Sequence, residues 1–299
     1  MNIQTASWQA LPEPVRDSWL CNIVWGGNEF ALENFTMPGL DGCLLSVPCN
    51  NSRAGGDIYH VTVCDRGVFS KFLLIDVAGH GESAEHISGR LKQPLTRLMS
   101  ELDNSAILEA LNHQILSNEP SGSFATAAAA TYNHWDHTLS YAYAGHPFIL
   151  IRRNGQWQQL PECCAGPPIG ILGDLSYYQN EVQLDGDDWL FLFSDALLEI
   201  KLDTGGRLGF KGLIKILNGI GTNDIAQFYQ SALAALVSVN GGAVFDDDLT
   251  LILLKQQIAE QQFSTRTIAR LRKLTMSWMK RKDTSCTTAL PKLPHVANV

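Results

Sequence analysis

The sequence predicts an α+β fold, with antiparallel strand pairs and helices in separate stretches of the chain. Residues 83–100 and 105–117 carry apolar side chains at helical spacing. Before and after these helices, pairs of apolar segments are separated by short polar turns, the pattern of a β-hairpin. The paired segments are residues 58–64 with 68–75, and residues 124–132 with 138–143.

The composition describes a globular chain with an acidic body. Of 299 residues, 45% are apolar and 17% are charged, which is enough apolar material for a large core. The net charge is −8, but it is unevenly spread. Residues 1–256 contain 14 Lys and Arg against 28 Asp and Glu, whereas residues 257–299 contain 8 against 2. An acidic body argues against nucleic acid as the main partner and permits divalent cation binding.

Three regions follow from the patterns. Residues 1–40 are mixed in character, and we interpret them as an N-terminal extension. Residues 41–256 form the predicted domain. Residues 257–299 are predicted to be a basic amphipathic helical tail with a disordered end after Asp283. We expect the tail to pack on the acidic body or on a second subunit, and an anionic membrane is the alternative.

We expect a cytoplasmic protein without a transmembrane segment. The first eight residues have no basic stretch followed by an apolar one, so no signal peptide is predicted. No apolar run reaches the length of a bilayer span. The seven cysteines include no CxxC pair, and reduced thiols are the favoured interpretation.

Two acids stand at the ends of the first predicted hairpin. Asp57 precedes residues 58–64, and Asp76 ends the apolar run that starts at residue 68. Antiparallel pairing therefore places both carboxylates at the same end of a sheet. The turn Gly79-His80-Gly81 follows directly, and its glycines allow backbone and water to approach a bound cation closely.

The second half of the chain repeats this arrangement. An apolar strand at residues 187–193 leads to Ser194-Asp195, and Asp246-Asp-Asp248 precedes a strand at residues 251–254. Helices are predicted near residues 211–217 and 224–239. The segment His134-Trp-Asp-His137 could be read as a metal site, but its position at a hairpin tip favours solvent-exposed turn residues.

Four strand-end acids form the candidate site: Asp57, Asp76, Asp195 and Asp247. Converging carboxylates without basic neighbours repel one another unless a cation neutralises them. Oxygen ligands without His or Cys select Mg²⁺ or Mn²⁺ over zinc. Two such ions can activate a water molecule and bind the oxygens of a phosphoester.

Six short motifs occur in an order that resembles a known family. They are Gly55-Gly-Asp57, Asp76-x-x-Gly-His-Gly81, Ala144-Gly-His-Pro147, Gly166-x-Pro-x-Gly170, Ser194-Asp195 with Glu199, and Asp247-Asp-x-Thr250. In this order they resemble the metal-dependent protein phosphatases of the protein phosphatase 2C-like (PPM) superfamily. The closest resemblance is to the bacterial branch typified by the stage II sporulation protein E phosphatase, and it covers roughly residues 40–256.

The resemblance implies a four-layer αββα sandwich, in which helices flank two antiparallel sheets and metals bind at one end. It also implies roles for single residues. Asp76 would bridge two Mn²⁺ or Mg²⁺ ions, and the Val77 carbonyl would bind the second. Asp195 and Asp247 would hold the first ion, and Asp57 would bind a metal or its water.

Several positions depart from the family pattern or have two interpretations. Ala196 replaces a family glycine and would be strained if that position needs a positive φ. His60 stands where an acid is often found. Arg53 could contact substrate phosphate or be an exposed loop residue. His80 is the candidate catalytic proton donor, with a structural turn histidine as the alternative. His146 is interpreted as structural.

The resemblance implies a hydrolase that acts on phosphoserine or phosphothreonine proteins. The expected partner is a STAS-domain, anti-anti-sigma-type protein in a partner-switching pathway. Regulation would come from a partner, from a homodimer or from the basic tail. Two alternatives stay open: a pseudophosphatase that binds phosphoproteins without turnover, and a phosphatase of small phosphorylated metabolites.

Overall fold

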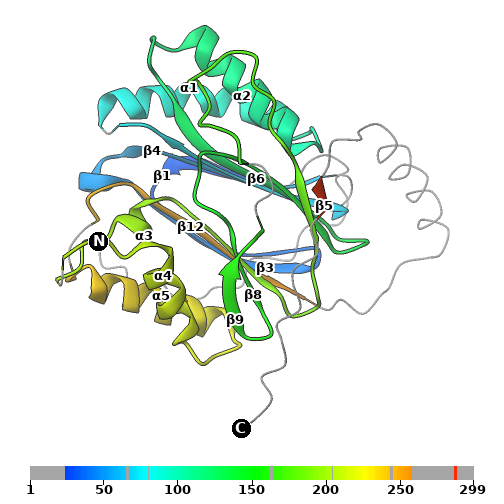
Figure 1. Ribbon diagram of the computed structural model, residues 1–299, viewed down its shortest axis with the longest axis vertical. Helices are drawn as coiled ribbons and strands as arrows, with labels where there is room; N and C mark the ends of the chain where they lie inside the picture. The colour runs from blue at the N-terminus through cyan, green and yellow to red at the C-terminus, as the bar shows by residue number, and fades with distance from the viewer. Residues whose placement is uncertain are drawn as a thin grey trace.

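The computed structural model describes residues 24–64, 67–79, 81–161, 165–203, 205–242, 245–257 and 286–287. In this part of the chain two β-sheets face each other, and helices cover the outer face of each (Figure 1). This confirms the predicted four-layer αββα sandwich. Alternate side chains of each strand point between the sheets, and they form a continuous apolar core there.

The first sheet is antiparallel apart from one short edge strand. Its order is β1-β4-β5-β6-β7-β10-β13, and β13 pairs parallel with β10. The bounds are β1 Val24–Glu29, β4 Ala54–Cys64, β5 Phe69–Val77, β6 Ala125–Asn133, β7 Thr138–Ala144, β10 Asn180–Gln183 and β13 Cys286–Thr287.

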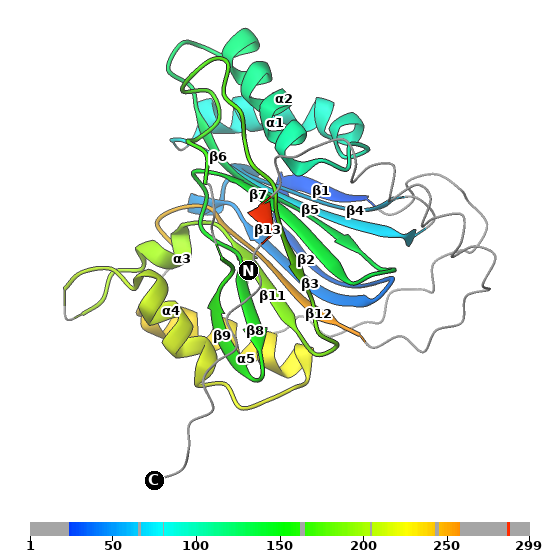
Figure 2. The same cartoon turned by 45° about the vertical axis from the view of Figure 1, so that its right-hand side comes forward.

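The second sheet is antiparallel throughout, in the order β2-β3-β12-β11-β8-β9 (Figure 2). Its central strand β12 is apolar on both faces, because one face contacts the other sheet and the other contacts helices. The bounds are β2 Ala31–Met37, β3 Leu40–Val47, β12 Leu249–Gln256, β11 Trp189–Phe193, β8 Leu150–Arg153 and β9 Gln156–Gln159.

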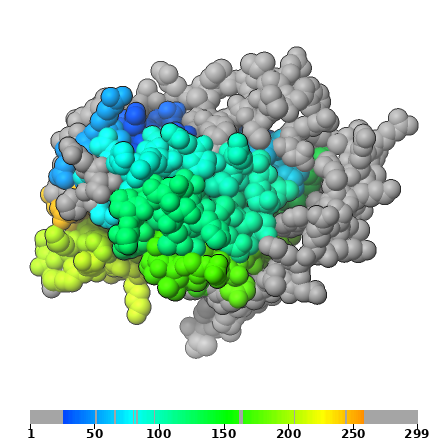
Figure 3. Space-filling view, turned by 90° about the horizontal axis from the view of Figure 1, so that it is seen from above, coloured from blue at the N-terminus to red at the C-terminus, as the bar shows by residue number. Residues whose placement is uncertain are grey.

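Helices α1 (Glu82–Leu98) and α2 (Asn104–Asn118) cover the first sheet, and Figure 3 looks onto their outer face. The predicted apolar stripe of α1 is buried against the sheet. Strand β6 presents small alanine side chains there, so the helices can approach the sheet closely. Helix α2 begins after Asp103, whose carboxylate accepts a hydrogen bond from the backbone N–H of Ser105 at 3.0 Å.

The second sheet is covered by α3 (Ala196–Glu199), α4 (Gly209–Asn218) and α5 (Ile225–Val239). Several aromatic side chains pack together in this layer. The ring of Phe228 on α5 lies 5.1 Å from that of Trp189 and 5.6 Å from that of Trp157, measured between centroids. Such contacts add to the stabilisation that the buried apolar area already provides.

The structure moves the boundary that we drew after residue 40. Strands β1 and β2 lie within residues 1–40, and they pair with β4 and β3. The pattern missed β1 because Gly26 and Gly27 have low strand propensity. They are required by packing, since a Cβ at Gly26 would lie 2.8 Å from the His60 ring.

Two further expectations need adjustment. At the β6–β7 turn Asp136 is exposed, but His134 and His137 are partly buried, and His137 Nδ1 lies 2.8 Å from the Tyr132 hydroxyl oxygen. Of the predicted tail, residues 258–285 and 288–299 lie outside the described residues. Cys286–Thr287 form β13, so the expected disorder after Asp283 does not apply to them.

Candidate metal centre at one end of the sandwich

The candidate site begins where β4 and β5 pair. Asp57 lies directly opposite Asp76 in the register of the two strands, which confirms the predicted juxtaposition. Asp57 lies two residues from Tyr59, and Asp76 lies two residues from Leu74, both of which belong to the core between the sheets. Because residues i and i+2 of a strand share a face, both carboxylates face the space between the sheets. Two like charges directly opposite each other destabilise a strand pair, so this arrangement favours a counter-charge.

The second sheet contributes hydroxyl groups to the same end. Ser194 and Thr250 hydrogen-bond the Asp57 side chain. The Ser194 and Thr250 segments also hold each other, since Thr250 N donates to Ser194 Oγ at 2.9 Å and Ser194 N donates to Thr250 O at 2.9 Å. Asp57 is 3% exposed, and its Oδ2 has no hydrogen-bond partner among the described residues.

Asp195 and Asp247 lie at the margin of this buried group. Asp195 follows β11 and is partly buried, and its charge acts on the Asp76 carboxyl group. Asp247 is exposed, yet its charge acts on both Asp76 and Asp195. The structure therefore brings Asp57, Asp76 and Asp195 into one group, with Asp247 at its edge.

The pKa values of the Asp57, Asp76 and Asp195 carboxyl groups are raised. Burial is the main cause for Asp57, followed by the charge of Asp76. Burial and the charges of neighbouring acids, first among them Asp195, raise the pKa of Asp76 to about 8. The pKa of Asp195 is raised by burial and by Glu199, and the charge of Arg207 opposes this shift. No basic group among the described residues offsets the raised pKa values of Asp57 and Asp76, so the ionised forms of these two acids lack a counter-charge.

The donor chemistry of these residues fits a hard divalent cation. The buried Oδ2 of Asp57 has no hydrogen-bond partner among the described residues, and burial together with acidic neighbours raises the pKa of Asp76 to about 8. Oxygen donors of this kind are the ligands that Mg²⁺ and Mn²⁺ prefer. Within the described residues, no group of three or more His, Cys, Asp or Glu side chains is placed so that it could hold a metal ion. The ligand set named from the sequence therefore stays a prediction.

The sequence reasoning missed the roles of two acids. Asp248 is buried, and its carboxylate accepts hydrogen bonds from the backbone N–H groups of Cys49 at 2.6 Å and Gly56 at 2.5 Å. Glu199 forms an ion pair with Arg207 next to Asp195. The motif Asp247-Asp-x-Thr250 could have indicated the role of Asp248. Two adjacent residues that enter a strand point in opposite directions, so Asp247 and Asp248 cannot both face the same side.

The other singled-out residues lie as follows. The Val77 carbonyl reaches the Gly56 backbone, since a Cβ at Gly56 would lie 3.1 Å from it. His80 lies outside the described residues. Arg53 is exposed at the start of β4, and its guanidinium has no hydrogen bond or ion pair with another described residue. Both interpretations of Arg53 stay open.

Two histidines and Ala196 have structural explanations. Burial lowers the pKa of His60 to about 4 and that of His146 to about 3, so both are neutral at pH 7. His146 Nδ1 lies 2.7 Å from the Thr126 hydroxyl oxygen. Ala196 begins α3, and it is not among the residues with positive φ. The strain expected at Ala196 is therefore absent, because Ala196 lies in a helix and its φ is not positive.

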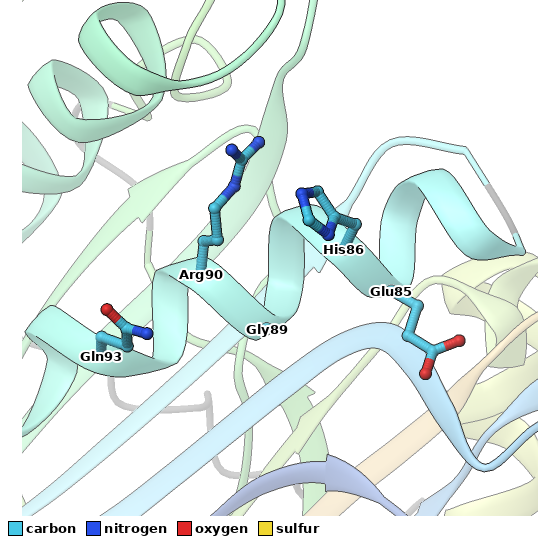
Figure 4. Close-up of a pocket in the computed structure, with 5 residues that line it drawn as sticks. All are labelled: Glu85, His86, Gly89, Arg90 and Gln93. Carbon is cyan, nitrogen blue, oxygen red and sulfur yellow. The ribbon is translucent and has the colours of Figure 1, made fainter.

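An open groove of about 410 Å³ lies along the outer side of α1 (Figure 4). Its lining residues come from that helix and include Glu85, His86 and Arg90. None of the four strand-end acids lines it. We therefore locate the candidate site at the strand ends and not in this groove. No helix among the described residues is long and apolar enough to cross a membrane.

Comparisons with known proteins bear on the family and the fold of this chain. A family model described as Stage II sporulation protein E (SpoIIE) matches residues 70–257. The phosphoserine phosphatase RsbU of Bacillus subtilis (strain 168) is 26% identical over 222 residues, which cover 73% of this chain and 64% of RsbU. The chain thus spans less than two thirds of that relative's length.

Solved structures share the fold. The RsbU and RsbW domains of a Mycobacterium tuberculosis protein match with a TM-score of 0.65 and 18% identity, covering 85% of this chain and 71% of that one. The PP2C phosphatase domain of SpoIIE from Bacillus subtilis, with a fragment of its regulatory domain, matches with a TM-score of 0.63 and 15% identity, covering 76% and 71%. Because the family model matches more than half of its residues, this chain belongs to the SpoIIE family of PP2C-type phosphatase domains.

Proposed function

We propose that this protein is a Mn²⁺- or Mg²⁺-dependent phosphatase of phosphoserine or phosphothreonine proteins. The observation that carries the proposal is the group of strand-end acids around the buried Asp57, whose Oδ2 has no hydrogen-bond partner among the described residues. Membership of the SpoIIE family and similarity to a phosphoserine phosphatase support it. Among structural neighbours, RsbX has been crystallised in complex with magnesium and PstP with two manganese ions.

Each acid has a role in this proposal. Asp76 would hold both ions, and the Val77 carbonyl would be a ligand of the second. Asp195 and Asp247 would hold the first ion, while Asp57 would bind a metal or its water. When bound, the two ions supply Lewis-acid activation of water and neutralise the charge of the phosphoester. Ser194 and Thr250 orient the Asp57 carboxylate by hydrogen bonds.

The surrounding residues determine where protons can be held. The neutral His146 is buried and hydrogen-bonded to Thr126, so it supports the strand end and does not donate a proton to a substrate. His80, between Gly79 and Gly81 in the sequence, is the residue that we propose as proton donor to the leaving group. The exposed Arg53 is the candidate for contact with a substrate phosphate.

We further propose that the substrate is a STAS-domain protein in a partner-switching pathway, in the cytoplasm. Similarity to RsbU, and to a structure that joins RsbU and RsbW domains, supports this choice. The pseudophosphatase alternative took its sequence support from Ala196. Since Ala196 has an ordinary helical conformation, that support is removed.

The direct test is hydrolysis of p-nitrophenyl phosphate and of a phosphorylated STAS-domain protein, each with Mn²⁺ and with EDTA. We expect Mn²⁺-dependent hydrolysis of both that EDTA abolishes. Activity that survives chelation would contradict the metal mechanism. Phosphoprotein binding without turnover would favour the pseudophosphatase. Turnover of phosphorylated metabolites but not of phosphoproteins would favour the small-molecule phosphatase.

A further inference from the structure

The peptide group that joins Gly55 to Gly56 on β4 lies immediately before Asp57, and both its carbonyl and its N–H are hydrogen-bonded by side chains. The carbonyl of Gly55 accepts hydrogen bonds from Asn28 Nδ2 at 2.9 Å and from Ser88 Oγ at 2.8 Å. The N–H of Gly56 donates to Asp248 Oδ2 at 2.5 Å. The C=O and the N–H belong to one planar group, so these bonds together determine its position and its rotation.

The three side chains come from different parts of the fold and are all buried. Asn28 lies on β1, beside β4, and is 2% exposed (Figure 2). Ser88 on α1 is 0% exposed, and Asp248 before β12 is 6% exposed. Asn28 Nδ2 also donates to Ser88 Oγ at 2.7 Å, and Lys92 Nζ donates to Asn28 Oδ1 at 2.7 Å. Because its oxygen accepts from Lys92, the Asn28 amide must present its N–H₂ group to the peptide.

The two glycines allow this close approach. A Cβ at Gly55 would lie 2.6 Å from the Asp248 carboxyl group, a distance that real side chains do not reach. A Cβ at Gly56 would lie 3.1 Å from the Val77 carbonyl oxygen and 3.3 Å from the Ala84 Cβ. The motif therefore needs glycine because backbone, helix and carboxylate meet at one point, and not because of an unusual φ.

We propose that the Gly55–Gly56 peptide is held by three positioning residues, namely Asn28, Ser88 and Asp248. By fixing this peptide they set where the Asp57 carboxylate meets an incoming divalent ion. This inference rests on the proposed function for the identity of the ion. Hard cations such as Mg²⁺ demand near-ideal ligand geometry, so a displaced carboxylate weakens binding before it affects folding.

The test compares matched pairs of variants. Ser88→Ala removes the hydroxyl group that contacts Gly55. Its control is Ser140→Ala, another buried serine under the α1–α2 layer, whose Oγ lies 3.4 Å from the Thr131 carbonyl oxygen. The second pair is Asn28→Ala and Asn104→Ala. Asn104 is also a buried amide, and it donates to the Ser140 carbonyl at 3.0 Å.

The first measurement is hydrogen exchange of residues 54–58 in the metal-free protein. Losing one buried hydrogen bond should make this segment exchange about tenfold faster in Ser88→Ala and in Asn28→Ala. The two control variants should leave the exchange of residues 54–58 unchanged. Equal exchange in Ser88→Ala and Ser140→Ala would overturn the inference, whether or not the protein is a phosphatase.

The second measurement is a Mn²⁺ titration, followed by melting temperature and by hydrolysis of p-nitrophenyl phosphate. Ser88→Ala and Asn28→Ala should each need about tenfold more Mn²⁺ than wild type to reach half of the maximal melting-temperature shift and half of the maximal hydrolysis rate. At saturating Mn²⁺ their kcat should be largely restored. Ser88→Thr, which keeps a hydroxyl, should restore the wild-type requirement. Faster exchange with an unchanged Mn²⁺ requirement would overturn the role in metal binding. Wild-type protein that neither binds Mn²⁺ nor hydrolyses phosphate would overturn both the metal role and the proposed function.

Discussion

The acidic end of the sandwich and the aromatic layer beneath α4 and α5 are built on opposite principles. In the aromatic layer, Trp189 and Phe228 pack with ring centroids 5.1 Å apart, and apolar burial stabilises the fold there. At the acidic end, Asp57 and Asp76 face each other with raised pKa values, and the charged forms repel. The aromatic layer stabilises the fold without a ligand, whereas the ionised acidic end is stabilised only when a cation neutralises it.

The largest expected effect is on activity, from Asp76→Asn. An amide cannot serve two cations, and metal ions contribute several kcal/mol to such reactions, so hydrolysis should fall roughly 100-fold or more. The metal-free variant should melt no lower than wild type, because a repelling charge is removed. The measurement is the p-nitrophenyl phosphate rate together with the melting temperature in EDTA. Asp174→Asn, at an exposed position, is the control. Retained activity in Asp76→Asn would refute the bridging role.

Phe228→Ala should have the largest effect on stability. It removes a ring that contacts both Trp189 and Trp157, and buried Phe→Ala changes cost about 3–5 kcal/mol of unfolding free energy. Urea unfolding measures this loss, and Phe30→Ala, at an exposed phenylalanine, should change it little. The Mn²⁺ requirement of the folded variant should stay at the wild-type value. A raised Mn²⁺ requirement would show that the two regions are coupled.

A smaller effect is expected on the pH dependence of the metal-free protein. The pKa of Asp76 is about 8 in the folded protein, whereas the ordinary pKa of an aspartate side chain is 3.8. Between these values the folded state binds the extra proton, so this group lowers stability as pH rises from about 4 to about 8. Urea unfolding in EDTA from pH 5 to pH 8 should show a shallower decline in Asp76→Asn than in wild type. Parallel pH profiles would contradict the raised pKa.

The smallest effect is expected from Ala196→Gly, which restores the family glycine. Ala196 begins a helix without positive φ, so glycine relieves no strain there. The greater freedom of glycine should lower the unfolding free energy by about 0.5–1 kcal/mol. The Mn²⁺ requirement, measured by titration of activity, should not change. Tighter Mn²⁺ activation in Ala196→Gly would show that the alanine weakens the site.

Local patterns in the sequence were sufficient for the hairpins, for both helical layers and for the juxtaposition of Asp57 and Asp76. Strand alternation and helical spacing are properties of neighbouring residues, so they can be read without the fold. The same patterns missed β1, because Gly26 and Gly27 are explained only by side chains of β4.

Only the tertiary structure decided which polar groups surround the site. The sequence by itself determined that an Asp-Asp pair enters the last strand, and the fold decided that Asp248 is buried and Asp247 exposed. The hydrogen bonds that hold the Gly55–Gly56 peptide join residues 27, 33 and 192 positions apart. A buried polar group needs a hydrogen-bond partner, but which group becomes that partner is determined only when distant segments of the chain pack together.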